Sequence, residues 1–115
     1  MKTILLILLN VILLTSGQLL WKKGLTAVGG ISLSNIMQVL MSPFIVGGLL
    51  LYAVATIVWF AVLSEADLSF AYPLQSMAYI IGMLAAWLIL KEVIPMTRWV
   101  GVLIIMIGVA VVSYK

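Results

Sequence analysis

Residues 44–63 read FIVGGLLLYAVATIVWFAVL, twenty residues without a charged side chain. A helix of about 20 apolar residues is long enough to cross the roughly 30 Å hydrocarbon core of a bilayer. This stretch is therefore predicted to be a transmembrane helix, and it decides the fold class.

Three more predominantly apolar stretches lie at 3–21, 68–90 and 96–114, of which the last contains one charged residue, Arg98. Over all 115 residues, 66% are hydrophobic and 8% are charged. A soluble domain of this size exposes too much of its chain to hide that much apolar surface. The sequence predicts an all-α integral membrane protein, with residues 1–115 forming a single four-helix transmembrane bundle.

The first stretch, 3–21, follows Lys2 and could also be a signal peptide. It is long for that role, no small-residue cleavage site follows it, and Lys22 and Lys23 close it. We therefore expect it to remain as the first helix.

A short helix is expected between the first two crossings. Asn35 is followed three residues later by Gln38, which is typical of a capping box at a helix N-terminus. Pro43 then interrupts the helix. Residues 35–42 are predicted to be an interfacial segment before the second crossing, or the kinked entry to that crossing.

The basic residues predict the orientation of the chain. The side of the first and third connectors carries four of them, and the side of the termini carries two: Lys22, Lys23, Lys91 and Arg98 against Lys2 and Lys115. Cytoplasmic loops are enriched in Lys and Arg, so both termini are expected outside the cytoplasm. A bias of this size leaves dual insertion open.

The composition also excludes several functions. The sequence has no cysteine and no histidine, which removes disulfides, thiolate metal sites and the usual proton shuttle. No nucleophile–base pair can be assembled, so we expect neither an enzyme nor a cofactor. The net charge of +3 is too small and dispersed for nucleic-acid binding.

No ionisable side chain lies near the middle of any crossing. The three carboxylates, Glu65, Asp67 and Glu92, all lie in connectors. A proton-coupled exporter of cations needs a carboxylate within the membrane. Its absence here argues against that mechanism.

Neutral polar residues recur at helical spacing in three of the crossings. The stripes are Asn10, Gly17 and Gln18 in the first, Gly48, Tyr52, Thr56 and Trp59 in the second, and Tyr72, Gln75, Ser76 and Tyr79 in the third. Such residues can simply hold helices together through interhelical hydrogen bonds of about 0.6 kcal/mol each. Three stripes in one small bundle favour a shared groove.

The fourth crossing differs from the others. Gly101 and Gly108 are seven residues apart on an aliphatic helix, with Ile105 between them. This spacing is typical of close helix packing and predicts an assembly face. Aromatic residues near helix ends are interpreted as interfacial anchors: Trp21, Trp87, Trp99 and Tyr114.

Lys22 and Lys23 have two interpretations. They can anchor the helix by snorkelling to the interface, or they can pair with a lipid phosphate at the mouth of the groove. Arg98 could bind phosphate likewise, with a bidentate geometry.

Several short strings resemble a known family. They are Ser16-Gly17-Gln18-Leu19 with Lys22, Ala71-Tyr72-Pro73 with Ser76, Lys91-Glu92, and Trp99-Val100-Gly101-Val102 with Gly108-Val109. Together they resemble the drug/metabolite transporter superfamily in its four-helix branch, which includes small multidrug resistance and EamA-like proteins.

Two positions depart from the small multidrug exporters. Those proteins carry a glutamate eight residues before the lysine that matches Lys22, where this chain has Leu14, and a tryptophan where it has Gln75. The Gly-Gln-Leu and Ala-Tyr-Pro strings are more similar to the small flippase subunits that move aminoarabinose-phosphoundecaprenol. This resemblance implies an EamA-like translocase of a lipid-linked sugar, or one half of one.

The expected function is a transporter or flippase of the bacterial inner membrane. It would move an amphipathic, lipid-linked or sugar-like substrate, such as an undecaprenyl-phosphate-linked sugar, as a homodimer or with a similar four-helix subunit. The expected substrate-binding residues are Asn10, Gln18, Lys22, Tyr52, Thr56, Tyr72, Gln75, Ser76 and Tyr79. Pro73 and Gly82 are the expected hinge, and Gly101, Ile105 and Gly108 the expected dimer interface. A multidrug or polyamine exporter and a non-transporting membrane subunit remain the alternatives.

Overall fold

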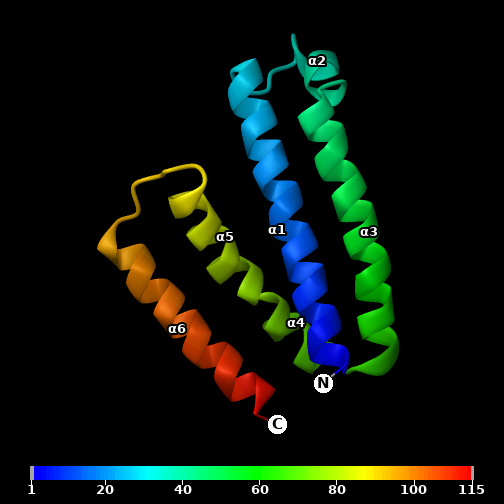
Figure 1. The fold of residues 1–115 in the computed structure, drawn as a ribbon, viewed down its shortest axis with the longest axis vertical. Coiled ribbons are helices and arrows are strands. Elements are labelled where there is room, and N and C mark those ends of the chain that lie inside the picture. The colour runs from blue at the N-terminus through cyan, green and yellow to red at the C-terminus, as the bar shows by residue number, and fades with distance from the viewer. Residues whose placement is uncertain (1, 115) are drawn as a thin grey trace.

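The computed structural model describes residues 2–114, which contain helices and no strand (Figure 1). In chain order the helices are α1 (Lys2–Val28), α2 (Ile36–Leu40), α3 (Pro43–Glu65), α4 (Leu68–Gln75), α5 (Met77–Leu88) and α6 (Met96–Ser113). Helices α1, α3, α4 with α5, and α6 are long and apolar enough for four membrane crossings. The predicted all-α membrane bundle, with a short helix before the second crossing, is confirmed.

Helix α1 continues past Trp21, where the first crossing was expected to end, as far as Val28. Lys22 and Lys23 lie inside it, because lysine is a good helix former and does not stop a helix. The helix ends where Gly29 and Gly30 adopt φ angles of 89° and 101°, which glycine adopts without strain.

The loop before α2 is held by Asn35, though not as the predicted capping box. Helix α2 has no side-chain cap. Instead, Asn35 Oδ1 accepts a hydrogen bond from the Ser32 backbone N–H at 2.7 Å, and its Nδ2 donates to the Gly30 carbonyl at 2.9 Å. Asparagine commonly closes turns in this way, in competition with a cap.

Helices α1 and α3 lie side by side and antiparallel along most of their length (Figure 1). Two glycines permit the close approach. A Cβ on Gly17 would lie 3.2 Å from the Gly48 carbonyl oxygen, and one on Gly48 would lie 2.9 Å from the Gly17 carbonyl oxygen. Small residues at such crossings let the two backbones pack closely.

Trp21 packs within this helix pair, so its interpretation as an interfacial anchor is incomplete. Its ring stacks on Tyr52 with centroids 4.3 Å apart, and its Nε1–H donates to the Ile45 carbonyl at 3.1 Å. Trp21 is placed against α3 because α1 extends two turns beyond it.

The third crossing is interrupted. Pro73 has no N–H to donate back along the helix, and α4 ends two residues later at Gln75. The Ser76 N–H bonds the Pro73 carbonyl at 3.0 Å, a tighter turn than an α-helix makes, before α5 begins. The break changes the direction of the chain between α4 and α5 (Figure 1).

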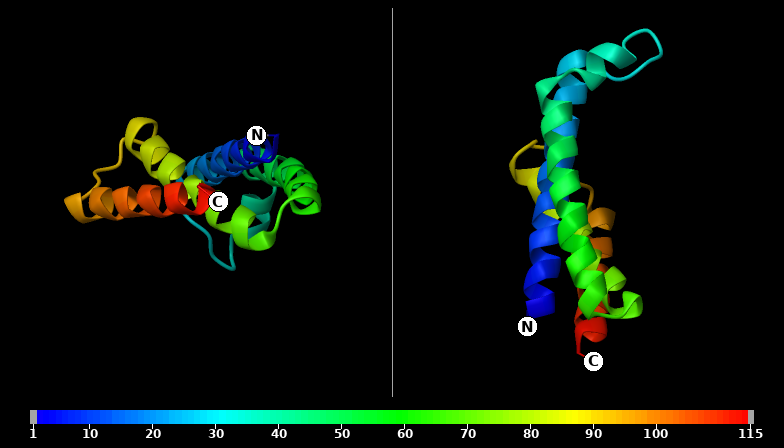
Figure 2. Two further views of the ribbon diagram at one scale, coloured as in Figure 1. Left: turned by 90° about the horizontal axis from the view of Figure 1, so that it is seen from below. Right: turned by 90° about the vertical axis from the view of Figure 1, so that its right-hand side faces the viewer.

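The apolar core lies where the crossings converge, at the end that holds the N-terminus and the α3–α4 connector. Its fully buried members are Ile7, Val11, Val62, Ala71 and Leu74. Away from this end, the hairpin of α5 and α6 diverges from the α1–α3 pair (Figures 1 and 2). The longest dimension, 49 Å, is comparable with the ~40–45 Å thickness of a bilayer including its headgroups.

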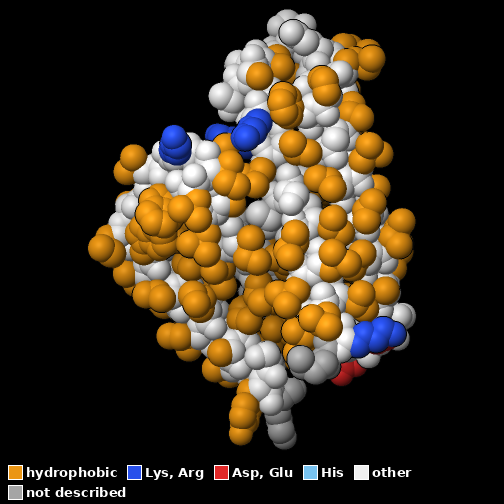
Figure 3. Space-filling model, in the orientation of Figure 1, with side chains coloured by type: hydrophobic (Ala, Val, Ile, Leu, Met, Phe, Trp, Pro, Cys, Tyr) orange, Lys and Arg blue, Asp and Glu red, His pale blue; other side chains and the backbone are white. Residues whose placement is uncertain are grey.

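The charge distribution fits a membrane crossing. In Figure 3 basic side chains lie at two levels of the visible face, and the surface between them is mostly apolar. At one end Lys2 pairs with Glu65 at 3.1 Å, so the N-terminus and the acidic connector share a side. Lys115, used in the orientation argument, lies outside the described residues.

Candidate functional site: an uncharged groove between the helices

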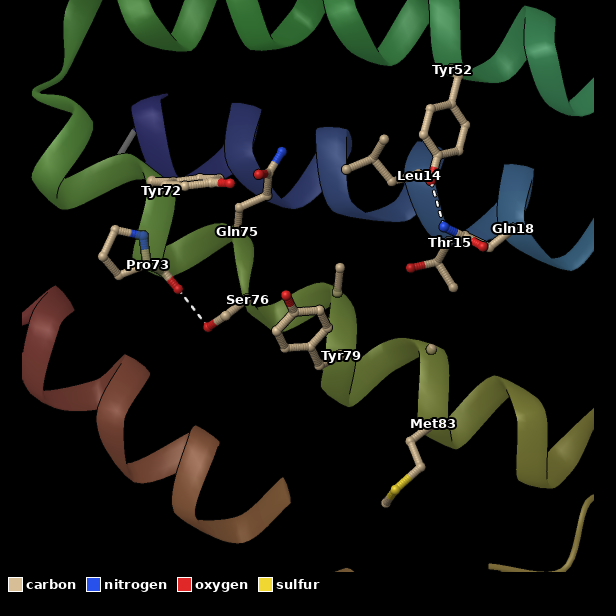
Figure 4. A pocket seen from close by; sticks show the side chains of 12 residues that line it. Leu14, Thr15, Gln18, Tyr52, Tyr72, Pro73, Gln75, Ser76, Tyr79 and Met83 are labelled. Carbon is tan, nitrogen blue, oxygen red and sulfur yellow. Dashed lines mark hydrogen bonds between the residues drawn. The ribbon is translucent and has the colours of Figure 1, made fainter. Parts of the chain in front are cut away.

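A groove of about 690 Å³ lies between α1, α3, α4 and α5 (Figure 4). Its lining residues are Leu14, Thr15, Gln18, Tyr52, Tyr72, Pro73, Gln75, Ser76, Ala78, Tyr79, Gly82 and Met83. The groove follows from the fold: the break after Pro73 turns α5 away from α1, and the core holds the other end closed.

Six of the nine expected substrate-binding residues line this groove, namely Gln18, Tyr52, Tyr72, Gln75, Ser76 and Tyr79. They come from three different crossings, as the three polar stripes predicted. The expected hinge residues Pro73 and Gly82 also line it, although α5 is continuous through Gly82 and the break falls at Ser76.

The polar groups of the groove are partly paired with one another. Gln18 Nε2 donates to the Tyr52 hydroxyl at 2.7 Å, which links α1 to α3 across the wall (Figure 4). Ser76 Oγ donates to the Pro73 carbonyl at 2.5 Å. Tyr72 and Tyr79 are about two-thirds exposed, at 64% and 67%. These two residues are therefore accessible to a molecule bound in the groove that they line.

Asn10 does not line the groove. It is 1% exposed, its Nδ2 donates to the Ala55 carbonyl at 2.8 Å, and its Oδ1 accepts from Gln75 Nε2 at 2.9 Å. A single side chain thus joins α1, α3 and α4. Because Asn10 lies outside the groove, its role is structural: its hydrogen bond holds Gln75, which does line the groove.

Thr56 also lies outside the lining. Its hydroxyl donates to the Tyr52 carbonyl one turn earlier, at 2.8 Å. This bond satisfies the hydroxyl within α3 and supports the turn that carries Tyr52.

Lys22 lies beside the groove rather than in it. It lines a smaller adjoining cavity of about 140 Å³, together with Thr15, Gln18, Leu19, Gly82, Ala86 and Leu90. Three of these residues, Thr15, Gln18 and Gly82, line both spaces. The cation is therefore beside the groove, in a cavity that adjoins it, and Lys23 lines neither space.

Four lining residues were not anticipated: Leu14, Thr15, Ala78 and Met83. Three of them are apolar and have no chemical signature in the sequence. Thr15 had one, because it shares a helical face with Gln18 and Lys22, at positions i, i+3 and i+7.

No lining residue of the groove carries a charge, and the described part of the chain holds no cluster of three potential metal ligands. Glu65 forms a salt bridge with Lys2 at the end of the bundle that holds the N-terminus. The groove offers amide and hydroxyl groups between apolar walls. Such a surface can bind a neutral, hydrogen-bonding molecule without the desolvation cost of a buried ion.

The glycines of α6 face outward. A Cβ on Gly101 or Gly108 would meet no described atom within 4 Å, and Ile105 between them is half-buried. No residue of α6 in the described structure is buried. This helix thus presents a wide apolar face to its surroundings.

The sequence matches known transporters over nearly its whole length. Two relatives are named as probable 4-amino-4-deoxy-L-arabinose-phosphoundecaprenol flippase subunits: ArnE of Erwinia tasmaniensis, 32% identical over 96% of this chain and 95% of the relative, and ArnF of Serratia proteamaculans, 31% identical over 90% and 86%. ArnE of Salmonella paratyphi B is 34% identical over about half of each chain. No solved structure matches significantly.

Residues 1–114 match the EamA-like transporter family, whose members here are transporter and flippase subunits rather than enzymes. Four helices able to cross the membrane and this match together make the chain a multi-pass membrane transporter. The chain belongs to the EamA-like transporter family.

Proposed function

We propose that this protein flips an amphipathic, lipid-linked sugar across the bacterial inner membrane, with the sugar in the groove and the lipid tail outside it. The observation that carries this proposal is a groove of about 690 Å³ lined by hydrogen-bonding side chains without a charge. Sugar hydroxyls that leave water need replacement partners, which amide and hydroxyl side chains supply.

The relatives support a lipid-linked substrate. Their names give a phosphoundecaprenol carrying an aminoarabinose as the molecule that they move. The same names describe subunits, which supports a partner for this chain. We propose a dimer, with a second copy or a similar four-helix subunit, that uses Gly101, Ile105 and Gly108 on α6. Membrane lipids surround the remaining apolar faces.

Movement of the substrate requires the groove to open to each side in turn. We propose that α5 swings relative to α4 at the Pro73–Ser76 break, where the helical hydrogen-bond ladder is already interrupted. Gly82, with open space around it, lets α5 approach and leave α1. Both termini are proposed to face away from the cytoplasm, which a reporter fused to the C-terminus tests.

Translocation in proteoliposomes tests the proposal. The probe is a fluorescent polyprenyl-phosphate-linked neutral sugar, and the readout is the rate at which an impermeant quencher reaches it. Loss of one neutral hydrogen bond, about 1 kcal/mol, corresponds to about fivefold in affinity or rate. We expect losses of this order for Tyr79→Phe and Gln75→Ala, and smaller ones for Ser76→Ala.

The chain supplies matched controls for two of these changes. Tyr114 is an exposed tyrosine outside the groove. Ser113 donates to the carbonyl three residues earlier at 3.1 Å, which is the same type of bond that Ser76 makes to Pro73. Tyr114→Phe and Ser113→Ala should transport like the wild type. If Gln18→Ala, Gln75→Ala and Lys22→Ala all do so too, the groove is not the transport site.

The same vesicles distinguish the two alternatives. Uptake of tetraphenylphosphonium driven by a pH gradient, with no movement of the lipid-linked probe, would identify a cation exporter. A non-transporting subunit would be unaffected by the groove variants, and its complex would fail with Gly108→Leu.

A further inference from the structure

Thr15 has a buried hydroxyl without a hydrogen-bond partner. The residue is 6% exposed, and its Oγ1 makes no hydrogen bond to any atom of residues 2–114. Buried polar groups in proteins are nearly always paired. An exception that lines a cavity therefore points to a ligand.

Two other helical threonines make a hydrogen bond to their own helix that Thr15 lacks. Thr26 and Thr56 each donate to the carbonyl four residues earlier, at 2.8 Å. Thr15 makes no such bond to Val11. Its side chain instead projects from α1 toward the space between α1 and α5 (Figure 4).

Thr15 lies where the large groove meets the 140 Å³ cavity and lines both. The smaller space is about ten times the ~10–15 Å³ that one water molecule requires, so it holds a group as large as a phosphate. The polar residues that line it are Thr15, Gln18 and Lys22, and each of them carries at least one hydrogen-bond donor.

These three donors converge by helix geometry. They stand at positions i, i+3 and i+7 of α1, on one face. Helical side chains lean toward the N-terminus, so the long Lys22 stem extends back toward Gln18 and Thr15. Gln18 uses one of its two N–H groups on Tyr52, which leaves the other available.

We propose that this cavity is a subsite for the phosphate of the lipid-linked substrate, bound by Thr15, Gln18 and Lys22. The inference rests on the proposed function and deepens it. The sugar occupies the large groove, the phosphate occupies the small cavity, and Gly82, which lines both, leaves the passage between them free.

Native mass spectrometry of the purified full chain tests the subsite with a polyprenyl phosphate and the matching polyprenol. Thr15→Val should weaken polyprenyl-phosphate binding about tenfold or more, the size of a charge-assisted hydrogen bond, and leave polyprenol binding unchanged. Thr15→Ser should restore binding. Lys22→Gln should weaken binding, whereas Lys23→Gln, its neighbour outside the cavity, should not.

A stability measurement separates binding from a structural role. Because the Thr15 hydroxyl is unpaired, Thr15→Val should keep or raise the Tm of the ligand-free protein, whereas Thr26→Val should not raise it. A lowered Tm for Thr15→Val would overturn the assignment, as would binding equal to the wild type.

Two further outcomes would overturn the proposal. Equal weakening by Lys22→Gln and Lys23→Gln would mean surface attraction alone. Displacement of polyprenyl phosphate by millimolar inorganic phosphate would mean that free phosphate, not a lipid, is the ligand. If Tyr79→Phe impairs translocation while Thr15→Val and Lys22→Gln do not, the proposed function stands and the subsite falls.

Discussion

The hydrogen bonds of Asn10 give the sharpest prediction about how the site is held. Its side chain is 1% exposed and joins Ala55 on α3 and Gln75 on α4, at 2.8 and 2.9 Å. Interhelical hydrogen bonds in membranes average about 0.6 kcal/mol, and the largest reach about 1.7. Asn10→Leu, which keeps the side-chain volume similar, should therefore cost about 1.2 kcal/mol for two bonds.

The pairwise part can be isolated by a double-mutant cycle of Asn10→Leu and Gln75→Leu. The free energy of unfolding is measured in mixed micelles for each single variant and for the pair. A coupling of about 0.6 kcal/mol is expected for the shared bond. Gln38→Leu, on the exposed face of α2, serves as the control and should change little.

Zero coupling, or an Asn10→Leu variant as stable as the control, would show that the hydrogen bonds of Asn10 do not stabilise the bundle. A residue that instead contacted substrate would raise the KM of transport without changing stability. Asn10→Leu should instead lower the free energy of unfolding. It should affect transport only because Gln75 is no longer held in place.

Three other predictions concern the helices that surround the groove. Gly48→Ala should lower the unfolding free energy strongly, because its Cβ would lie 2.5 Å from Trp21 Cδ1, whereas Gly82→Ala should not lower it because its Cβ would meet open space. Gly101→Leu should shift the protein from dimer to monomer in native mass spectrometry while its circular dichroism stays helical; a dimer that persists would place the interface elsewhere. Pro73→Ala restores a backbone N–H and should slow translocation at unchanged helix content by stiffening the α4–α5 break, so an unchanged rate would show that this break is not the hinge.

The fold was predictable from the sequence because a membrane helix carries a strong signal. Four stretches of about 20 predominantly apolar residues leave few alternatives to a bundle of crossings. The exact ends were harder. Lys22 and Lys23 suggested the end of α1, yet the helix ends only where Gly29 and Gly30 leave the helical region of φ.

The groove was predictable only as a set of faces. Spacing placed Gln18, Tyr52 and Gln75 toward the interior, and the structure brings them to one groove. Spacing could not reveal which polar residues would be used up in packing. Asn10 and Gln18 both belong to the polar stripe of α1, but Asn10 lies in the closed end of the bundle and Gln18 in the open end.

Thr15 shows the complementary difficulty. A threonine in a helix usually bonds its own backbone, so the helical face that Thr15 shares with Gln18 and Lys22 could not show that its hydroxyl would be unpaired. Only the packing of α1 against α5 shows that its hydroxyl is buried and unpaired, and that Thr15 lines two adjoining cavities.

Photocrosslinking can show whether the sugar of the substrate binds in the groove, because the crosslink marks the residues beside the sugar. A polyprenyl-phosphate-linked sugar with a diazirine on the sugar ring is incorporated with the protein into vesicles and irradiated, and the labelled peptides are identified. We expect labelling of groove residues on α5, at Tyr79 and Met83, and loss of that label when unlabelled substrate is added in excess. Labelling confined to the lipid-facing residues of α6, such as Leu103 and Ile107, would contradict this expectation.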